Sequence, residues 1–135
     1  MKSYLIDPVV KTIEETDYNG DWRTISQTIE ASRGLFTVVN LYENEDSVFV
    51  DDEGLYVDDQ RFWIHKNYPQ PLAGPGLFLG TDEEGDSVAP KTDIKQVRDD
   101  IVFIGDKHHL ALLHKIYGSI EDYRPYFFES EKETV

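Results

Sequence analysis

Hydrophobic and polar positions alternate along much of this chain in short runs separated by turn residues, a pattern typical of half-buried strands. The run 11–18 sets Ile13 among threonine and carboxylate side chains, so we expect an edge strand or a one-sided strand and not a central one. The run 35–42 is rich in β-branched and aromatic residues and predicts a buried strand. Further strands are expected at residues 3–6, 47–51, 55–57, 62–64, 76–80 and 101–104.

Helical spacing interrupts this alternation. Trp22, Ile25 and Ile29 recur at helical intervals and predict a helix over 22–32, with Asp21 as its N-cap. It is the helix that the sequence indicates most directly.

Cap residues indicate where the remaining helices begin and end. Thr92 and Asp106 are placed as N-caps of two further helices, and Gly118 stands where the second of these should stop. Ser119, with Asp122 three residues later, forms the pattern of a capping box for one further turn.

These elements predict a single α+β domain over residues 1–128. We expect a mostly antiparallel sheet of about five to seven short strands, with two or three helices packed against it. Residues 129–135 are charged and are expected to form a frayed tail. The expected core consists of Trp22, Ile25, Ile29, Phe36, Val38, Val48, Val50, Trp63, Leu77, Leu79, Ile101, Phe103, Leu110 and Leu113.

The segment 68–87 is the expected centre of the sheet. Its prolines at 69, 71 and 75 fix φ and remove amide donors, whereas its glycines at 74, 76, 80 and 85 can take positive φ. The segment therefore predicts a rigid entry, an apolar strand and an acidic turn that closes on Gly85.

Composition limits the class of protein. Hydrophobic residues make up 39% of the 135 residues, which is too many for a disordered chain, and the absence of cysteine excludes disulfides and thiolate zinc sites. No apolar run approaches the roughly 20 residues that cross a bilayer, and the N-terminus lacks the apolar core of a signal peptide. We therefore expect a cytoplasmic protein.

Charge changes the picture most. The formal net charge is -14, which argues against direct binding to nucleic acid or an anionic membrane and favours a basic partner. Acidic clusters fall at 43–46, 51–53, 58–59, 82–86, 99–100 and 129–133, mostly on predicted turns. The residues expected to bind the partner are Asp51, Asp52, Glu53, Asp58, Asp59, Asp82, Glu83, Glu84 and Asp86. Gathered on one side they would form a binding surface, whereas spread evenly they would only keep the domain soluble.

The acidic turn at 82–86 also raises the question of calcium. Its carboxylates are adjacent, its glycine is the fourth residue and the twelfth, Asp93, is not glutamate, so it does not match a helix–loop–helix calcium loop. A solvated hairpin turn is the favoured interpretation. The similar turn at 51–54 would add to a site only if the two lay close together in the fold.

The four histidines do not predict a metal site. His109 and His114 are five residues apart, which does not place them on one helix face, and neither His108 nor His65 has a local ligand motif. Structural or surface roles are favoured, and no metal or other cofactor is expected.

Motifs of catalysis are missing as well. Gly74-Pro75-Gly76 leads into a strand and is not a phosphate-binding loop, and no serine stands in a nucleophile elbow. A hydrolase built on a buried carboxylate pair would need one carboxyl in an apolar site, which a sequence does not reveal. We therefore expect a protein without enzymatic activity.

Several turn-rich segments resemble a set of small uncharacterised proteins carried by bacteriophages, plasmids and bacterial genomes. They are YLIDP at 4–8, DYNGD at 17–21, VDDEGL at 50–55 and PLAGPGLFLGTDEEGD at 71–86. The resemblance covers roughly the first 90 residues and carries no catalytic residues. It implies a mobile-element context and action in the cytoplasm of a bacterial host.

Two functions from different classes follow. The first is an acidic interaction protein that sequesters or inhibits a basic host protein, such as a nuclease or a nucleic-acid-binding complex, by mimicking nucleic acid, in the manner of an anti-defence inhibitor. The second is a small-ligand or metal-binding module built on the Pro/Gly segment and the acidic turn. The oligomeric state stays open, because Phe127 and Phe128 could pack on their own domain or on a partner chain.

Overall fold

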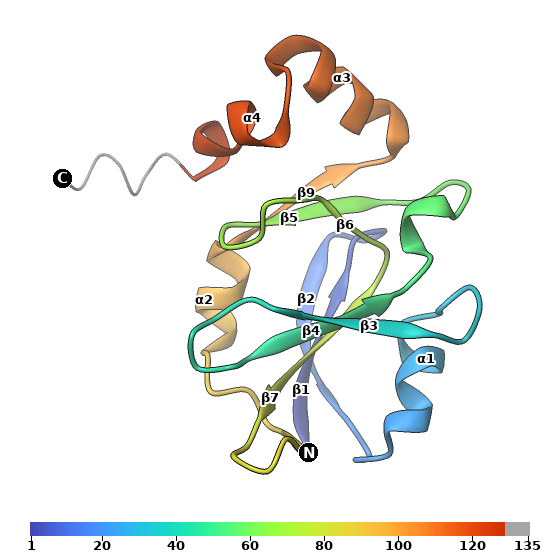
Figure 1. Cartoon of the computed structure of the whole chain (residues 1–135), viewed down its shortest axis with the longest axis vertical. Coiled ribbons are helices and arrows are strands. Elements are labelled where there is room, and N and C mark those ends of the chain that lie inside the picture. The colour runs from blue at the N-terminus through green and yellow to red at the C-terminus, as the bar shows by residue number, and fades with distance from the viewer. Residues whose placement is uncertain (129–135) are drawn as a thin grey trace, which may run out of the picture.

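The larger of two sheets holds most of the strands in the chain (Figure 1). This computed structural model describes residues 1–128, so the expected tail at 129–135 lies outside the described part. The sheet has the strand order β2-β1-β7-β4-β3, with β8 paired to the end of β7, and every pairing is antiparallel. Its strands are β1 (Lys2–Asp7), β2 (Thr12–Asp17), β3 (Phe36–Asn40), β4 (Ser47–Asp51), β7 (Gly76–Thr81) and β8 (Ser87–Val88).

A smaller sheet stacks above the first and carries the C-terminal helices (Figure 1). Its strands, in the order β6-β5-β9, are β5 (Phe62–His65), β6 (Leu72–Ala73) and β9 (Ile101–Gly105). The helices are α1 (Ile25–Thr28), α2 (Ile94–Asp99), α3 (Lys107–Tyr117) and α4 (Ile120–Phe127), and short 3₁₀ helices cover Trp22–Thr24 and Gly54–Tyr56. The predicted α+β class and the antiparallel sheet are confirmed.

The segment 68–87 does supply the central strand of the larger sheet. β7 lies between β1 and β4 because residues 76–79 pair on both sides. Trp63 anchors the entry to this strand, since its indole Nε1 donates to the carbonyl of Gly74 at 2.9 Å. A Cβ on Gly76 would lie 2.7 Å from the Val48 Cγ2 atom, so the close packing of the strands here requires glycine.

Most of the core lies between the two sheets. Trp63, Phe78 and Tyr4 are almost fully buried within it, and the rings of Tyr4 and Phe78 stack at 5.7 Å. A second cluster fills the space between the larger sheet and α1, and a third holds α4 against the smaller sheet through Ile64 and Tyr123. None of the helices in residues 1–128 has the length and apolarity needed to span a bilayer.

The expected helix over 22–32 is wrong in its length. Residues 22–24 form a 3₁₀ turn and the α-helix ends at Thr28, although Asp21 does cap the start by accepting from the Arg23 amide at 3.0 Å. Ile25 is fully buried at the start of the α-helix, whereas Trp22 lies in the 3₁₀ turn that precedes it. The Trp22 side chain is 65% exposed instead of buried.

The strand expected to be buried at 35–42 is a sheet edge. Val38 is 51% exposed, and within β3 only Val39 is buried, because one side of the strand has no neighbouring strand. The strand expected at 55–57 is wrong, because Gly54–Tyr56 form a 3₁₀ turn. By contrast, β2 is at a sheet edge as predicted.

The start of α2 and the burial of α3 also differ from the predictions. The cap of α2 is Asp93 and not Thr92, whereas Asp106 caps α3 and Ser119 caps α4 as expected. The capping box predicted for Ser119 and Asp122 is present, and Asp106 forms a capping box as well. Leu110 and Leu113, expected in the core, are only half-buried on α3. They differ because α3 contacts the rest of the protein mainly through β9 and α4, which leaves much of its surface in solvent.

Candidate functional site

Two acidic turns meet at one end of the larger sheet. Because β4 and β7 run antiparallel with Ser47 opposite Leu79, the turn before β4 and the turn after β7 lie side by side. Both turns line an open hollow of about 360 Å³, together with Asn40 at the end of β3. Five carboxylates of these two turns line the hollow or could share a metal ion, and we call them the hairpin cluster: Glu45, Asp82, Glu83, Glu84 and Asp86.

Asp82 builds the hairpin that presents this cluster. Its Oδ1 atom accepts from the amides of Glu84 and Asp86, both at 2.9 Å, and its own amide donates to the carbonyl of Asp86. Gly85 takes a φ of 86°, which suits glycine, and its amide closes the turn on the carbonyl of Asp82. The favoured interpretation of this segment as an exposed hairpin turn is therefore confirmed, and the carboxylates of Glu83, Glu84 and Asp86 are exposed.

The hairpin cluster has no ion pair with the lysines and arginines of residues 1–128. In the described part of the chain, none of its five carboxylates lies within ion-pair distance of a lysine or an arginine. The carboxylates of Asp82, Glu84 and Asp86 each offer an oxygen within 4.8 Å of the others. At this separation like charges raise the electrostatic energy of the turn, so a bound cationic group would stabilise it.

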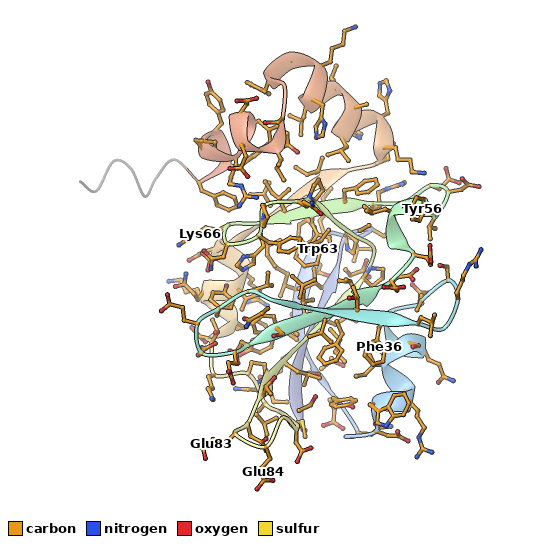
Figure 2. The ribbon with its side chains drawn as sticks, in the orientation of Figure 1. Phe36, Tyr56, Trp63, Lys66, Glu83 and Glu84 are labelled. Carbon is orange, nitrogen blue, oxygen red and sulfur yellow. The ribbon has the colours of Figure 1, made fainter. Side chains whose placement is uncertain are left out.

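The other predicted acidic residues lie elsewhere: Figure 2 shows Glu83 and Glu84 far from Tyr56, which follows the turn at 51–54. Val50 pairs with Gly76, so the turn at 51–54 follows the opposite end of β4 from the hairpin cluster. Asp52, Asp58 and Asp59 are exposed in this second region, and Glu53 is half-buried. The nine residues expected on one acidic surface are therefore divided between two ends of the sheet.

Three carboxylates from the predicted acidic clusters are buried and hold the fold. Asp51 is 7% exposed and accepts from the amides of Ser32 and Glu53, each at 2.9 Å. Asp46 is fully buried, and its Oδ2 atom accepts from two amides of the loop before α2, at 2.9 and 2.6 Å. Asp100 is 3% exposed. Asp51 therefore does not belong to a partner-binding surface, because both of its oxygens serve backbone amides.

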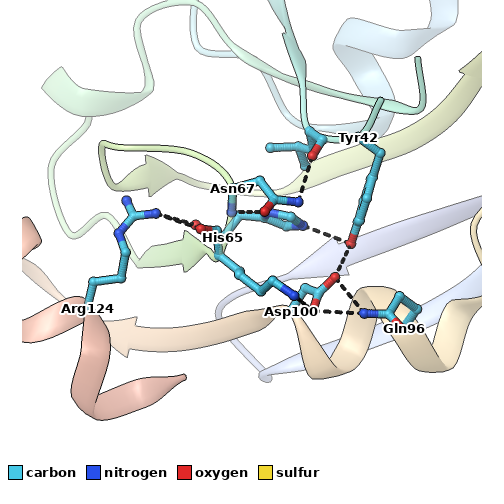
Figure 3. A network of polar contacts seen from close by, with 8 residues as sticks. Tyr42, His65, Asn67, Gln96, Asp100 and Arg124 are labelled. Carbon is cyan, nitrogen blue, oxygen red and sulfur yellow. Dashed lines mark hydrogen bonds and ion pairs between the residues drawn. The ribbon is translucent and has the colours of Figure 1, made fainter. Parts of the chain in front are cut away.

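Asp100 belongs to a buried polar network that the sequence did not predict (Figure 3). The Tyr42 hydroxyl donates to the Asp100 Oδ2 atom at 2.8 Å and lies 2.9 Å from the His65 Nε2 atom. The side-chain amide of Gln96 donates to both oxygens of Asp100. The backbone amide of Asn67 donates to the His65 Nδ1 atom at 3.0 Å. These residues tie the turn after β3 to β5 and to the start of β9.

Arg124 joins α4 to the same region. Its guanidinium donates to the carbonyls of His65, Lys66 and Tyr68, which form the end of β5 and the loop after it. Because the side chain is 15% exposed, these contacts hold the C-terminal helices against the smaller sheet. The only sequence signal for this network is a histidine at the end of the apolar run 62–65, since a buried polar group needs partners.

The titratable side chains of this network are poorly suited to catalysis. His65 is fully buried, and burial lowers its pKa to about 4, so the imidazole is neutral and both ring nitrogens are occupied. Burial, and then the hydrogen bond to Asp100, raise the pKa of Tyr42 above its usual value. A tyrosine with a raised pKa is a poor nucleophile, and a histidine without an open nitrogen is no general base.

The other histidines do not converge on a ligand set. His108 and His109 are exposed at the start of α3, where His109 interacts with the capping Asp106 at 2.8 Å. His114, also exposed, lies 3.4 Å from the hydroxyl of Tyr123. Among residues 1–128, the group of side chains close enough to share a metal ion consists of carboxylates of the hairpin cluster.

Comparisons with other proteins add no relative to this picture. The features of the chain that bear on its function are the hairpin cluster, the divided acidic surface and the buried network. No protein-family model, no curated protein and no solved structure matches this chain.

Proposed function

We propose that this protein is a non-enzymatic interaction protein that binds a basic partner through the hairpin cluster. The observation that carries the proposal is the meeting of five carboxylates from two turns with no lysine or arginine of residues 1–128 within ion-pair distance. Basic side chains of a partner would relieve the repulsion between these carboxylates when they bind.

The proposed partner is a protein that itself binds nucleic acid. Duplex DNA carries about one negative charge per 1.7 Å of helix axis, so a protein that binds it has a dense cationic groove. A compact group of carboxylates with a spacing below 4.8 Å for three members resembles such a charge density locally. A nuclease or another basic nucleic-acid-binding protein of a bacterial host, inhibited in the bacterial cytoplasm, fits this chemistry and the mobile-element context that the resemblance implies.

The proposed contact is the hairpin cluster alone, which has fewer residues than the nine-residue binding surface expected from the sequence. The second acidic region, around Asp52, Asp58 and Asp59, lies at the other end of the sheet and supplies solubility and long-range attraction in the proposal. This division makes a matched comparison possible, because the same charge can be removed from either end.

Affinity capture with charge-matched variants tests the proposal. The protein and the triple variant Glu83→Gln/Glu84→Gln/Asp86→Asn are immobilised and exposed to bacterial lysate at low and high salt, with duplex DNA as competitor. Asp82 is left unchanged because it builds the turn. We expect the wild-type protein to capture basic nucleic-acid-binding proteins that salt and DNA release, and the triple variant to lose them.

The control removes the same charge from the second region through Asp52→Asn/Asp58→Asn/Asp59→Asn. Asparagine is suited to position 59, whose φ is 54°. We expect this control to keep the captured proteins. Equal loss of the captured proteins in both triple variants would mean that net charge alone explains the binding, and would contradict the proposed contact. Capture that does not depend on salt would contradict the proposal as well.

A second candidate, binding of a divalent cation, is favoured by the short spacing of Asp82, Glu84 and Asp86. Hard cations take carboxylate oxygens, and Asp82 would have to use the oxygen that does not accept the turn amides. Calorimetric titration with Ca²⁺ and Mg²⁺ tests it. Heat that saturates for the wild-type protein and vanishes for Asp86→Asn would support this candidate, and no heat at millimolar cation would remove it.

A further inference from the structure

The two edges of the larger sheet are built in opposite ways. The edge strand β2 carries Glu14, Glu15 and Asp17, and Arg98 donates to the outer carbonyl of Ile13 at 2.9 and 2.6 Å. The edge strand β3 and the residues flanking it, 35–41, contain no charge and no proline. Charges and covering side chains protect an edge from pairing with another chain, so β2 is protected and β3 is open.

The register of β3 shows which of its backbone groups point outward. The amide of Asp52 donates to the carbonyl of Leu35, and the amide of Leu41 donates to the carbonyl of Asp46. In an antiparallel pair the bonded positions alternate, so residues 35, 37, 39 and 41 face β4. The amides and carbonyls of Phe36, Val38 and Asn40 therefore face away from the sheet, and within residues 1–128 no strand pairs with them.

Each end of β3 opens into a hollow of different chemistry. Phe36, the first residue, lines a hollow of about 510 Å³ together with Trp22 and Leu35, which are 65% and 59% exposed. Asn40, the last residue, lines the hollow of the hairpin cluster. Residues 36 and 40 share one face of the strand because their separation is even, and four strand residues span about 13 Å.

We propose that the outer edge of β3 accepts an extended segment of the basic partner as an additional antiparallel strand. The segment would bond to the outward amides and carbonyls of β3 and would carry a lysine or arginine four residues before an apolar residue. The cation would lie in the hollow of the hairpin cluster, and the apolar side chain beside Trp22. This inference rests on the proposed function and adds to it the conformation and the residue pattern of the partner.

Charge decides between a basic partner and a second copy of this chain. Two chains of net charge -14 repel one another, and a second copy that paired through its own β3 edge would bring no cation, because residues 35–41 are uncharged. A basic segment instead places its charge against carboxylates that have no ion-pair partner in residues 1–128. Strand addition of this kind takes affinity from backbone bonds and specificity from alternate side chains.

A synthetic peptide tests the pairing. The end-capped peptide Thr-Lys-Thr-Val-Thr-Leu-Thr is titrated into labelled protein, and hydrogen exchange of the amides of Phe36, Val38 and Asn40 is followed by NMR. We expect these three amides to become protected. We also expect the peptide to bind about tenfold more weakly when alternate peptide nitrogens are methylated on the bonding edge, because methylation removes donors and keeps the charge. The reversed sequence should bind more weakly as well.

Proline variants of the protein provide the matched control. Val38→Pro removes an outward amide at the centre of β3 and leaves the ladder with β4 intact. Glu15→Pro removes an outward amide from the protected edge strand β2 and leaves its ladder with β1 intact. The bond from the Tyr18 amide to the Met1 carbonyl defines the register there. We expect Val38→Pro to abolish protection of the Phe36 and Asn40 amides and Glu15→Pro to leave it unchanged. The spectra of both variants report whether they are folded.

The outcomes separate this inference from the proposed function. Equal binding of the methylated peptide would overturn strand pairing and leave charge recognition standing. Protection of the β3 amides that rises with protein concentration in the absence of peptide would identify a second copy as the occupant and overturn the inference. If protection persists in Glu83→Gln/Glu84→Gln/Asp86→Asn, the hairpin cluster is not the cationic site. That result would contradict the proposed function and the placement of the cation, and would leave the strand pairing standing.

Discussion

The stability of this protein should depend on pH through one buried histidine. His65 is fully buried, and its Nδ1 atom accepts from the Asn67 amide at 3.0 Å. The single proton of the Tyr42 hydroxyl is donated to Asp100, so this hydroxyl accepts from the Nε2 atom of His65. The imidazole is therefore neutral with its proton on Nε2, and a second proton on Nδ1 would face an amide donor.

The magnitude follows from the pKa in the folded and unfolded states. Burial, with smaller effects from Lys66 and Arg124, lowers the pKa of His65 from 6.5 to about 4, although the charge of Asp100 acts in the opposite direction. Between these values the unfolded chain binds more protons than the folded protein, so stability falls as the pH falls. From about pH 7 to about pH 5 the loss is about 2 kcal/mol, and the full loss at lower pH is about 3 kcal/mol.

Urea unfolding of the wild-type protein and His65→Gln at both pH values provides the assay. Glutamine keeps a donor near the Nε2 position and does not titrate, but it removes the acceptor of the Asn67 amide. We expect the variant to be less stable than the wild type by about 1–3 kcal/mol at about pH 7. That difference should shrink by about 2 kcal/mol at about pH 5, which is still above the isoelectric point of about 4.5.

Parallel pH dependence of the two proteins would refute the reasoning. It would mean that His65 binds a proton in the folded protein as readily as in the unfolded chain, and hence that the network of Figure 3 opens to solvent. A measurement of the imidazole nitrogens by NMR gives an independent check, because the neutral ring should carry its proton on Nε2.

Three further predictions concern the residues that hold the fold. Arg124→Met should lower the free energy of unfolding by about 3 kcal/mol in a urea titration and increase hydrogen exchange in α4, because three carbonyls lose a charged donor. Gly76→Ala should cost about 1–3 kcal/mol in thermal unfolding, because its Cβ would lie 2.7 Å from the Val48 Cγ2 atom, and an unchanged melting temperature would contradict the close packing of β7. Asp46→Ala should destabilise by about 2–3 kcal/mol and Asp46→Asn by less, since asparagine keeps an oxygen for the two loop amides; equal losses would show that these bonds contribute little.

The sequence alone determined what depends on neighbouring residues. Caps at Asp106 and Ser119, the hairpin turn at 82–86 and most strand positions were predicted because alternation, capping side chains and turn glycines act over a few residues. The α+β class follows from the order of these elements. Trp22 is the exception, since helical spacing did not distinguish an α-helix from a 3₁₀ turn.

Only the tertiary structure decided which residues meet. The register of β4 against β7 places the turn at 51–54 at the opposite end of β4 from the turn at 82–86 and gathers the hairpin cluster. It joins segments about thirty residues apart in the chain. Pairing between distant strands also leaves β3 at an edge and buries Asp51, which no local pattern of charge indicates. Long-range strand pairing depends on the shape and burial of the whole sheet, and for that reason the proposed binding edge could be found only in the folded protein.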